Sequence, residues 1–74
     1  MNNEIIVYST RTWSNWAMMK EFLEAQGLPY KEVNVQEDVD AQKLAQKTGQ
    51  MGMIKVNNQW VLDFDPEKLK KYLH

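Results

Sequence analysis

The order in which short apolar runs and helix-like segments alternate limits the possible folds of this chain more than any other feature. Residues 4–8, EIIVY, are a β-branched and aromatic run short enough for a strand buried on both faces. Residues 14–27 follow with a helical apolar arc that stops at Gly27, and residues 30–35, YKEVNV, alternate like a half-buried strand. The positions expected on the arc are Met18, Met19, Phe22, Leu23 and Ala25. Because parallel strands need a long crossover, this segment predicts a β-α-β unit with a parallel strand pair.

The second half of the chain predicts a helix, a hairpin and a last helix. Residues 37–49 begin with acids, which suit a helix N-terminus, and stop at a glycine. Residues 53–64 indicate two short strands around an Asn-Asn turn, and Asp65 with Pro66 predicts the start of the last helix. The apolar positions expected to pack are Val39, Leu44 and Ala45 in the first helix and Leu69, Tyr72 and Leu73 in the second. The predicted fold is α/β, in the order β-α-β-α-β-β-α, with a mixed four-stranded sheet flanked by helices in one domain, 1–74.

The composition excludes several classes of chemistry. The 74 residues contain no cysteine, and their one histidine, His74, is terminal, so thiol nucleophiles, thiolate metal sites and an ordinary imidazole base are missing. The net charge of −1 lacks the broad basic field of non-specific nucleic-acid binders. No run has the length of a membrane span or the pattern of a signal peptide. We therefore expect a soluble, cytoplasmic-type protein that is not an enzyme and has neither cofactor nor metal.

Four collinear segments carry a resemblance to a known family. They are VYST at the end of the first strand, MKEFLEAQGLPYKEVNV through the first helix and second strand, AQKTGQMG before the third strand, and FDPEKLKKYL at the close. In this order, over nearly the whole chain, they are similar to small bacterial and archaeal glutaredoxin-like proteins. The resemblance implies the minimal thioredoxin fold.

The active-site segments depart from the glutaredoxin pattern. Where the family has a Cys-Pro-x-Cys box, this chain has WSNW, residues 13–16, and Arg11 replaces a frequent proline just before it. The family's cis-proline corresponds to Ile54, and a glycine beside which glutathione approaches corresponds to Asp63. The resemblance implies that these loops share one face. Because a non-proline cis bond costs about 2.5–4 kcal/mol, we expect a trans peptide bond between Met53 and Ile54.

Loss of both thiols excludes disulfide exchange, and the replacing residues suggest contact with a partner instead. Tryptophan and arginine are enriched at binding hot spots, and methionine adapts to irregular surfaces. Trp13, outside the helix, is expected to be exposed; for Trp16 packing and exposure both remain open, and Trp60 is expected to pack. The expected partner-binding residues are Arg11, Trp13, Ser14, Asn15, Trp16, Met19, Met53, Ile54 and Lys55.

The expected partner is a protein, and the chain itself is expected to be a monomer. Arg11 and Lys55 would provide cations beside apolar surface, which suits an acidic enzyme cleft such as a lysozyme-type active site. Concentration of the changes in one patch favours an engineered, recombinant binder or inhibitor. The alternatives are residual binding of glutathione or another small ligand, stacking of single-stranded nucleic acid on the tryptophans, and a scaffold with no partner.

Overall fold

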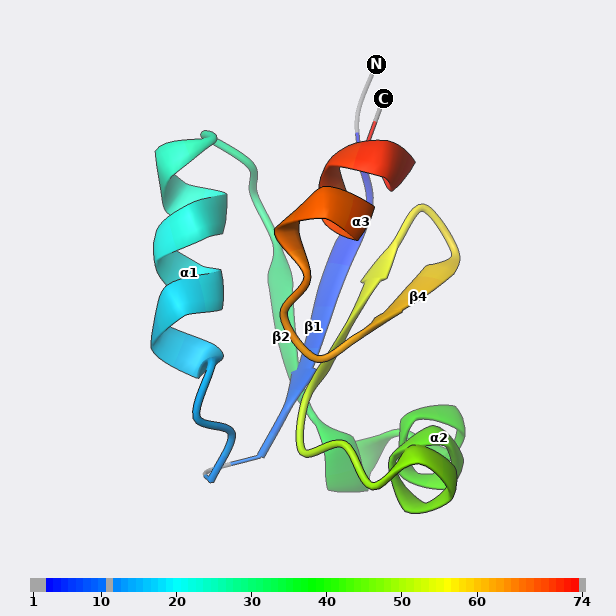
Figure 1. Cartoon of the computed structure of the whole chain (residues 1–74). Helices are drawn as coiled ribbons and strands as arrows, with labels where there is room; N and C mark the ends of the chain where they lie inside the picture. Colours follow the sequence, from blue (N-terminus) through cyan, green and yellow to red (C-terminus); the bar gives the residue numbers. More distant parts are fainter. Residues whose placement is uncertain (1–2, 11, 74) are drawn as a thin grey trace.

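The computed structural model describes residues 3–10 and 12–73, and its elements follow the predicted order (Figure 1). The strands are β1 (Ile5–Ser9), β2 (Lys31–Asn34), β3 (Met53–Val56) and β4 (Gln59–Leu62). The helices are α1 (Trp16–Ala25), α2 (Val39–Thr48) and α3 (Pro66–Tyr72), with a short 3-10 helix, η1 (Val35–Glu37), between β2 and α2. Among the described residues, no helix is both long enough and apolar enough to cross a lipid bilayer.

The four strands form one mixed sheet in the order β2-β1-β3-β4. β1 runs parallel to β2 and antiparallel to β3, and β3 and β4 form an antiparallel hairpin. This arrangement confirms the predicted fold. Because successive side chains of a strand point to opposite faces, β1 and β3 each supply two separate apolar clusters, one with α1 and α3 and the other with α2. Figure 1 shows α2 near the lower end of the sheet, away from α1.

Local signals in the sequence account for most element boundaries. The side chains of Asp38 and Asp65 accept hydrogen bonds from the backbone N–H groups of Ala41 and Lys68, and so cap α2 and α3. Gly49 ends α2 in the left-handed conformation, with φ 75°. Asn57 and Asn58, at φ 49° and 68°, form the predicted hairpin turn, because asparagine tolerates positive φ in such turns.

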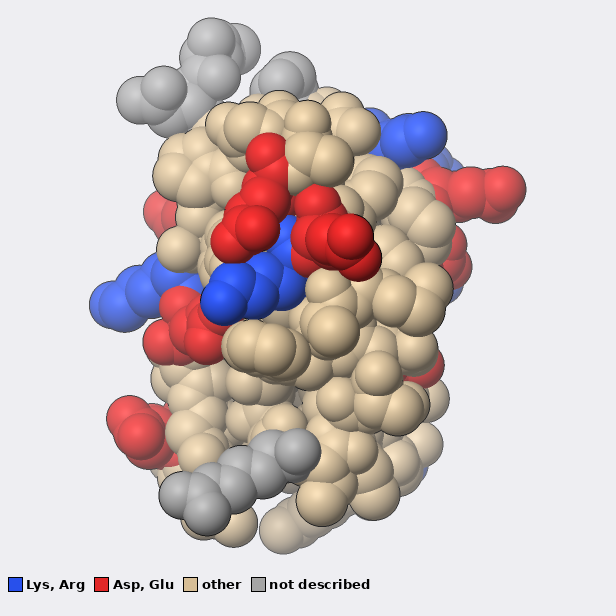
Figure 2. All heavy atoms as spheres, turned by 90° about the vertical axis from the view of Figure 1, so that its left-hand side faces the viewer, with Lys and Arg blue, Asp and Glu red and all other residues tan. Residues whose placement is uncertain are grey.

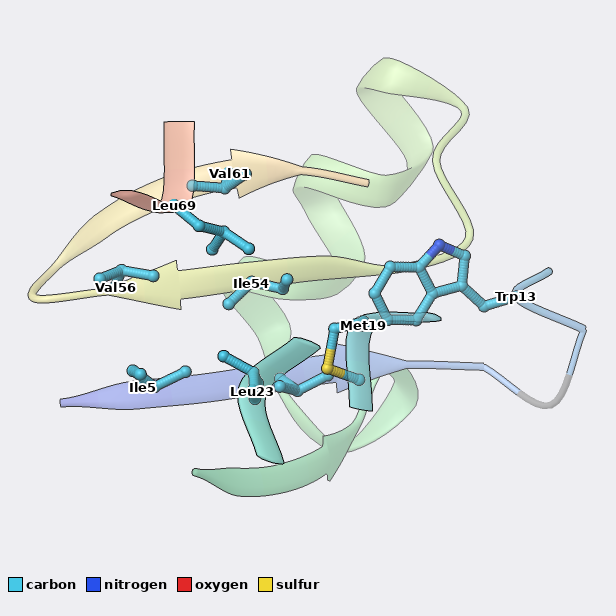
Figure 3. Close-up of a cluster of buried hydrophobic side chains, with 9 residues drawn as sticks. Ile5, Trp13, Met19, Leu23, Ile54, Val56, Val61 and Leu69 are labelled. Carbon is cyan, nitrogen blue, oxygen red and sulfur yellow. The ribbon is translucent and has the colours of Figure 1, made fainter. Parts of the chain in front are cut away.

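The main core lies between the sheet and the α1 and α3 helices (Figure 3). Its fully buried members include Met19 and Leu23 of α1 and Leu69 of α3. Met18, which the helical arc placed inside, is 56% exposed, and Ala25 is exposed as well. The buried stripe of α1 is therefore narrower than the sequence predicted, because α1 covers one side of the sheet without a second layer above it.

On the other face of the sheet, α2 packs through a different set of residues than expected. Val39 is 64% exposed at the start of α2, whereas Ala41 is fully buried. Leu44 and Ala45 pack against the second cluster as predicted. Val39 is the first residue of α2, directly after the Asp38 cap, and the face that carries Ala41, Leu44 and Ala45 is the one that packs on the sheet.

Candidate functional site

Trp13 is part of the core, so the prediction that it is exposed was wrong. Its side chain is 6% exposed and belongs to the main cluster, where Figure 3 shows the indole beside Met19. The ring lies directly against Gly52, since a Cβ built on Gly52 would stand 2.0 Å from Trp13 Cδ2. Only glycine leaves room for the indole at this position, because real side-chain carbons do not approach so closely. Trp13 therefore closes one end of the core.

A carboxylate on the opposite loop fixes the Trp13 indole. Trp13 Nε1 donates a hydrogen bond of 2.6 Å to Asp63 Oδ1, and Asn15 Nδ2 donates to the same oxygen at 3.0 Å. Asp63 itself has φ 57°, a left-handed conformation that aspartate tolerates better than most residues, and its backbone N–H donates to Gly52 O at 3.0 Å. The three segments that contain Trp13, Gly52 and Asp63 are thus tied together, and we call this set with Asn15 the Asp63 clamp.

The clamp also shifts the acidity of Asp63. Partial burial on its own would raise the pKa of this carboxyl group, because it disfavours the charged form. Hydrogen bonds from Asn15 and Trp13, with one from the Phe64 backbone, stabilise the carboxylate and outweigh the effect of burial. The pKa of Asp63 therefore lies below its ordinary value, and the carboxylate is the form that holds the clamp.

Three further predicted contact residues are buried. Met19, Met53 and Ile54 have no exposed surface, so none of them can meet a partner in this conformation. Ile54 lies inside β3, between Val7 of β1 and Val61 of β4. The Met53–Ile54 peptide bond is trans, as predicted, since none of the described peptide bonds is cis.

Gly52 is the residue that lies against Trp13 at the start of β3. The resemblance to glutaredoxin-like proteins had placed Ile54 there, as the counterpart of the family's cis-proline. Gly52 comes immediately before β3, whereas Ile54 is its second residue. Strand alternation already separates two of the predicted contact residues, because Ile54 and Lys55 are neighbours on one strand and so point to opposite faces.

Lys55 lies on the other face of the sheet from Trp13, which corrects its assignment to the site. Its register partner is Trp60, and its Nζ stands 5.3 Å from the centroid of that indole. Trp60 packs against Tyr8 with ring centroids 5.2 Å apart, in the cluster under α2, as predicted for a packing residue. Arg11, the other predicted cation, lies outside the described residues. Among the described residues, β3 thus brings no basic side chain to the face of the sheet on which Trp13 and Trp16 lie.

A groove beside the start of α1 remains as the candidate site. It has a volume of about 520 Å³ and lies between the segment that leads into α1 and the neighbouring β2 strand. We call it the Trp16 groove; its lining residues are Ser9, Thr10, Trp13, Ser14, Trp16, Ala17, Glu32, Val33 and Asn34. In the view onto α1, charged side chains gather over the upper part of the helix, whereas the described atoms of the lower part are mostly uncharged (Figure 2).

Of the predicted contact residues, Trp13, Ser14 and Trp16 line the groove together. Trp16 is partly buried and packs against the main core with one part of its indole, so packing and exposure, the two alternatives for this residue, both hold. Asn15 does not line the groove and serves the clamp instead. Glu32 is the one charged side chain among the described lining residues. It was not among the predicted contact residues, because the alternation of residues 30–35 indicates only that Glu32 lies on the polar side of a half-buried strand.

The described lining residues of the Trp16 groove offer both hydrogen-bonding groups and apolar surface. The hydroxyl groups of Ser9, Thr10 and Ser14 can donate and accept hydrogen bonds, and the indole of Trp16 offers apolar contact. No group of three or more histidine, aspartate or glutamate side chains that could hold a metal ion occurs in residues 3–10 and 12–73.

Comparison with known proteins supports the fold. No model of a protein family matches the sequence, and a search of curated proteins finds no match. Among solved structures, the crystal structure of a mutant of the thioredoxin-like protein BC3987 is similar, with a TM-score of 0.72 and 26% sequence identity over 96% of this chain and 100% of the other. The chain therefore has a thioredoxin-like fold.

Proposed function

We propose that this chain is a redox-inactive thioredoxin-fold module that binds a segment of another protein in the Trp16 groove. One observation carries the proposal: a partly exposed tryptophan stands among hydroxyl groups in a hollow of about 520 Å³. A tryptophan that is packed on one side and accessible on the other is a common binding hot spot, because it offers a large apolar area at low entropic cost.

The neighbouring strand adds a second feature that suits a protein segment. β2 is an edge strand, so one side of its backbone has no strand partner among the residues that the structure describes. Extended peptides bind such edges by adding a strand, while adjacent pockets receive alternate side chains. The lining of the groove by Glu32, Val33 and Asn34 of β2 places the edge and the hollow together.

The finer identity of the scaffold is also part of the proposal. The collinear segments of the sequence support a glutaredoxin-type scaffold, and the WSNW box supports an engineered replacement of its redox centre. Lys55 does not contribute to the Trp16 groove, because it lies over Trp60 on the other face of the sheet, so its insertion into an acidic enzyme cleft is not proposed. The proposed partner is a protein, and the proposed contacts are those of the Trp16 groove.

A small ligand is the second candidate, because the volume of the groove is within the range of small-molecule pockets. Glutathione carries two carboxylates, and the described lining residues oppose it with the carboxylate of Glu32. Trp13 also occupies the space above Gly52, next to the start of β3. Calorimetric titration with glutathione separates the candidates: we expect no saturable heat, and clear saturation would favour the small ligand.

Selection of random ten-residue peptides displayed on phage tests the proposal. We expect the protein to enrich peptides that lose affinity at least about ten-fold for Trp16→Ala, the loss typical of a hot-spot residue. Trp60→Phe is the matched control, because Trp60 lies on the other face of the sheet. Failure to enrich any peptide, or enriched peptides that bind the Trp16→Ala variant equally well, would contradict the proposal.

A further inference from the structure

The start of α1 differs from the starts of the other two α-helices in the described residues. Asp38 and Asp65, at the N-caps of α2 and α3, accept hydrogen bonds from backbone N–H groups of their own helices. Asn15, at the N-cap of α1, makes no such side-chain bond, although asparagine is among the best capping residues. The first turn of α1 also carries no acidic side chain, whereas Asp40 and Glu67 occupy the first turns of α2 and α3. Local capping therefore does not explain where α1 begins.

The Asn15 side chain is used by the Asp63 clamp instead. Asn15 Nδ2 donates to Asp63 Oδ1 at 3.0 Å, across 48 positions of sequence. The pKa of Asp63 is lowered, and an ionised carboxylate only accepts hydrogen bonds, so Asn15 must turn its amide nitrogen toward Asp63. A carboxylate from a distant part of the chain thus holds the residue at which α1 starts.

The backbone of Asn15 also differs from that of the two local caps. Its φ and ψ are −91° and 7°, whereas Asp38 has −127° and 120° and Asp65 has −132° and 95°. A residue that caps its own helix typically has such an extended conformation. To become a local cap, Asn15 would have to rotate far about ψ, and this rotation would turn residues 13–14 relative to α1.

The residues on both sides of Asn15 line the Trp16 groove, whereas Asn15 and Asp63 themselves do not. The lining residues of this segment are Trp13, Ser14, Trp16 and Ala17. Trp16 N donates to Trp13 O at 3.2 Å, and Asp63 Oδ1 accepts from both Trp13 Nε1 and Asn15 Nδ2. The turn from residue 13 to residue 16 is therefore attached to one carboxylate oxygen at two points.

From this geometry we infer that Asp63 is a positioning residue for the Trp16 groove. While its carboxylate holds Asn15, α1 begins without a local cap and the Trp16 indole keeps its place in the groove. Without that bond, the Asn15 side chain is free to accept a hydrogen bond from the first turn of α1, and residues 13–14 turn with it. For binding, this role rests on the proposed function and adds the residue that sets the shape of the site.

Asn15→Asp separates the two arrangements. Aspartate caps helices as well as asparagine does, but it has no amide group to donate to Asp63 and adds a second negative charge beside it. In isotope-labelled free protein, the backbone chemical shifts of residue 15 report its φ and ψ, and the indole N–H resonance reports the surroundings of Trp16. We expect residue 15 to become extended and the Trp16 resonance to shift. Asn15→Ser repeats the test without the added charge.

Three further variants isolate the bond to Asp63. Asn58→Asp makes the same change of charge in the hairpin turn, outside the groove, and should alter neither readout. Asp63→Asn retains a side-chain oxygen that accepts from Asn15, so residue 15 should keep its conformation. Asp63→Gly tolerates the positive φ but has no acceptor, so it should reproduce the effect of Asn15→Asp.

The peptides enriched on the full chain give a second readout. We expect Asn15→Asp to weaken their binding about five-fold and Asn58→Asp to leave it unchanged. The inference is overturned if residue 15 keeps its conformation in Asn15→Asp and Asp63→Gly, or if it becomes extended while the Trp16 resonance or the peptide affinity stays the same. If no peptide binds to the unmodified protein, the proposed function has failed, and the chemical shifts alone decide the positioning role.

Discussion

Trp13 and Trp16 are three positions apart in the sequence and have different surroundings in the structure. Trp13 is buried in the main core, rests on Gly52 and donates a hydrogen bond to Asp63. Trp16 packs against the same core with part of its ring and lines an open groove with the rest. The difference shows that the segment at the start of α1 has two sides: one packs in the core, and the other lines the groove that we propose as the binding site.

The comparison also shows why position outside a helix does not decide exposure. In a chain of 74 residues, most large apolar side chains are needed inside. A loop tryptophan becomes a core residue when the facing backbone is a glycine and a carboxylate can accept the indole N–H. Gly52 and Asp63 provide both for Trp13.

Substitution of the two tryptophans by alanine should give the largest contrast. Trp13→Ala removes a buried indole and leaves a cavity, so the free energy of unfolding should fall by about 3–5 kcal/mol. Trp16→Ala removes a half-exposed indole, and its loss should be about 1–2 kcal/mol. Urea unfolding followed by circular dichroism measures both. Equal losses would mean that the two rings have the same structural role.

Gly52→Ala tests the close contact under Trp13. The added methyl would overlap the indole, so the ring or the backbone must move, and overpacking of this kind typically costs about 1–3 kcal/mol. Combined with Trp13→Leu, the same substitution should cost much less, because the ring is gone. An undiminished cost in the double variant would show that Gly52 is required for another reason.

Asp63→Asn tests the clamp through its pH dependence. The folded-state pKa of Asp63 is lowered, so its contribution to stability is present above the unfolded pKa of about 3.9 and is lost as the pH falls through the folded value. Asparagine keeps the shape and tolerates the positive φ, but it lacks the charge. We expect the variant to be about 1–2 kcal/mol less stable at pH 7 and to match the parent protein at low pH. A difference that persists unchanged at low pH would exclude the charge as the cause.

Lys55→Gln should have the smallest effect. Its ammonium lies over Trp60 at a partly exposed position, so the free energy of unfolding should fall by about 0.5–1 kcal/mol. Peptide affinity in the Trp16 groove should not change. A loss of affinity with Lys55→Gln would place the binding face on the α2 side of the sheet.

The sequence predicted those parts of the fold that depend on local chemistry. The Asn57–Asn58 turn and the Asp65 cap each act within a few residues, so they could be read directly. The burial of Trp13 could not, because it depends on a hydrogen bond to a residue 50 positions away. The assignment of Ile54 was wrong for a different reason. The resemblance matched the family's cis-proline to Ile54, but the residue that lies against Trp13 is Gly52, two positions earlier. Strand alternation also separates Ile54 from Lys55.

The central claim is that the Trp16 side of this segment binds a partner while the Trp13 side holds the fold. The most direct test is to titrate an enriched peptide into ¹⁵N-labelled protein and follow the three indole N–H resonances. We predict that the Trp16 resonance shifts most, that the Trp13 indole N–H exchanges slowly with solvent both before and after binding because it is bonded to Asp63, and that Trp60 does not respond. A response centred on Trp60, or release of the Trp13 N–H on binding, would contradict the account.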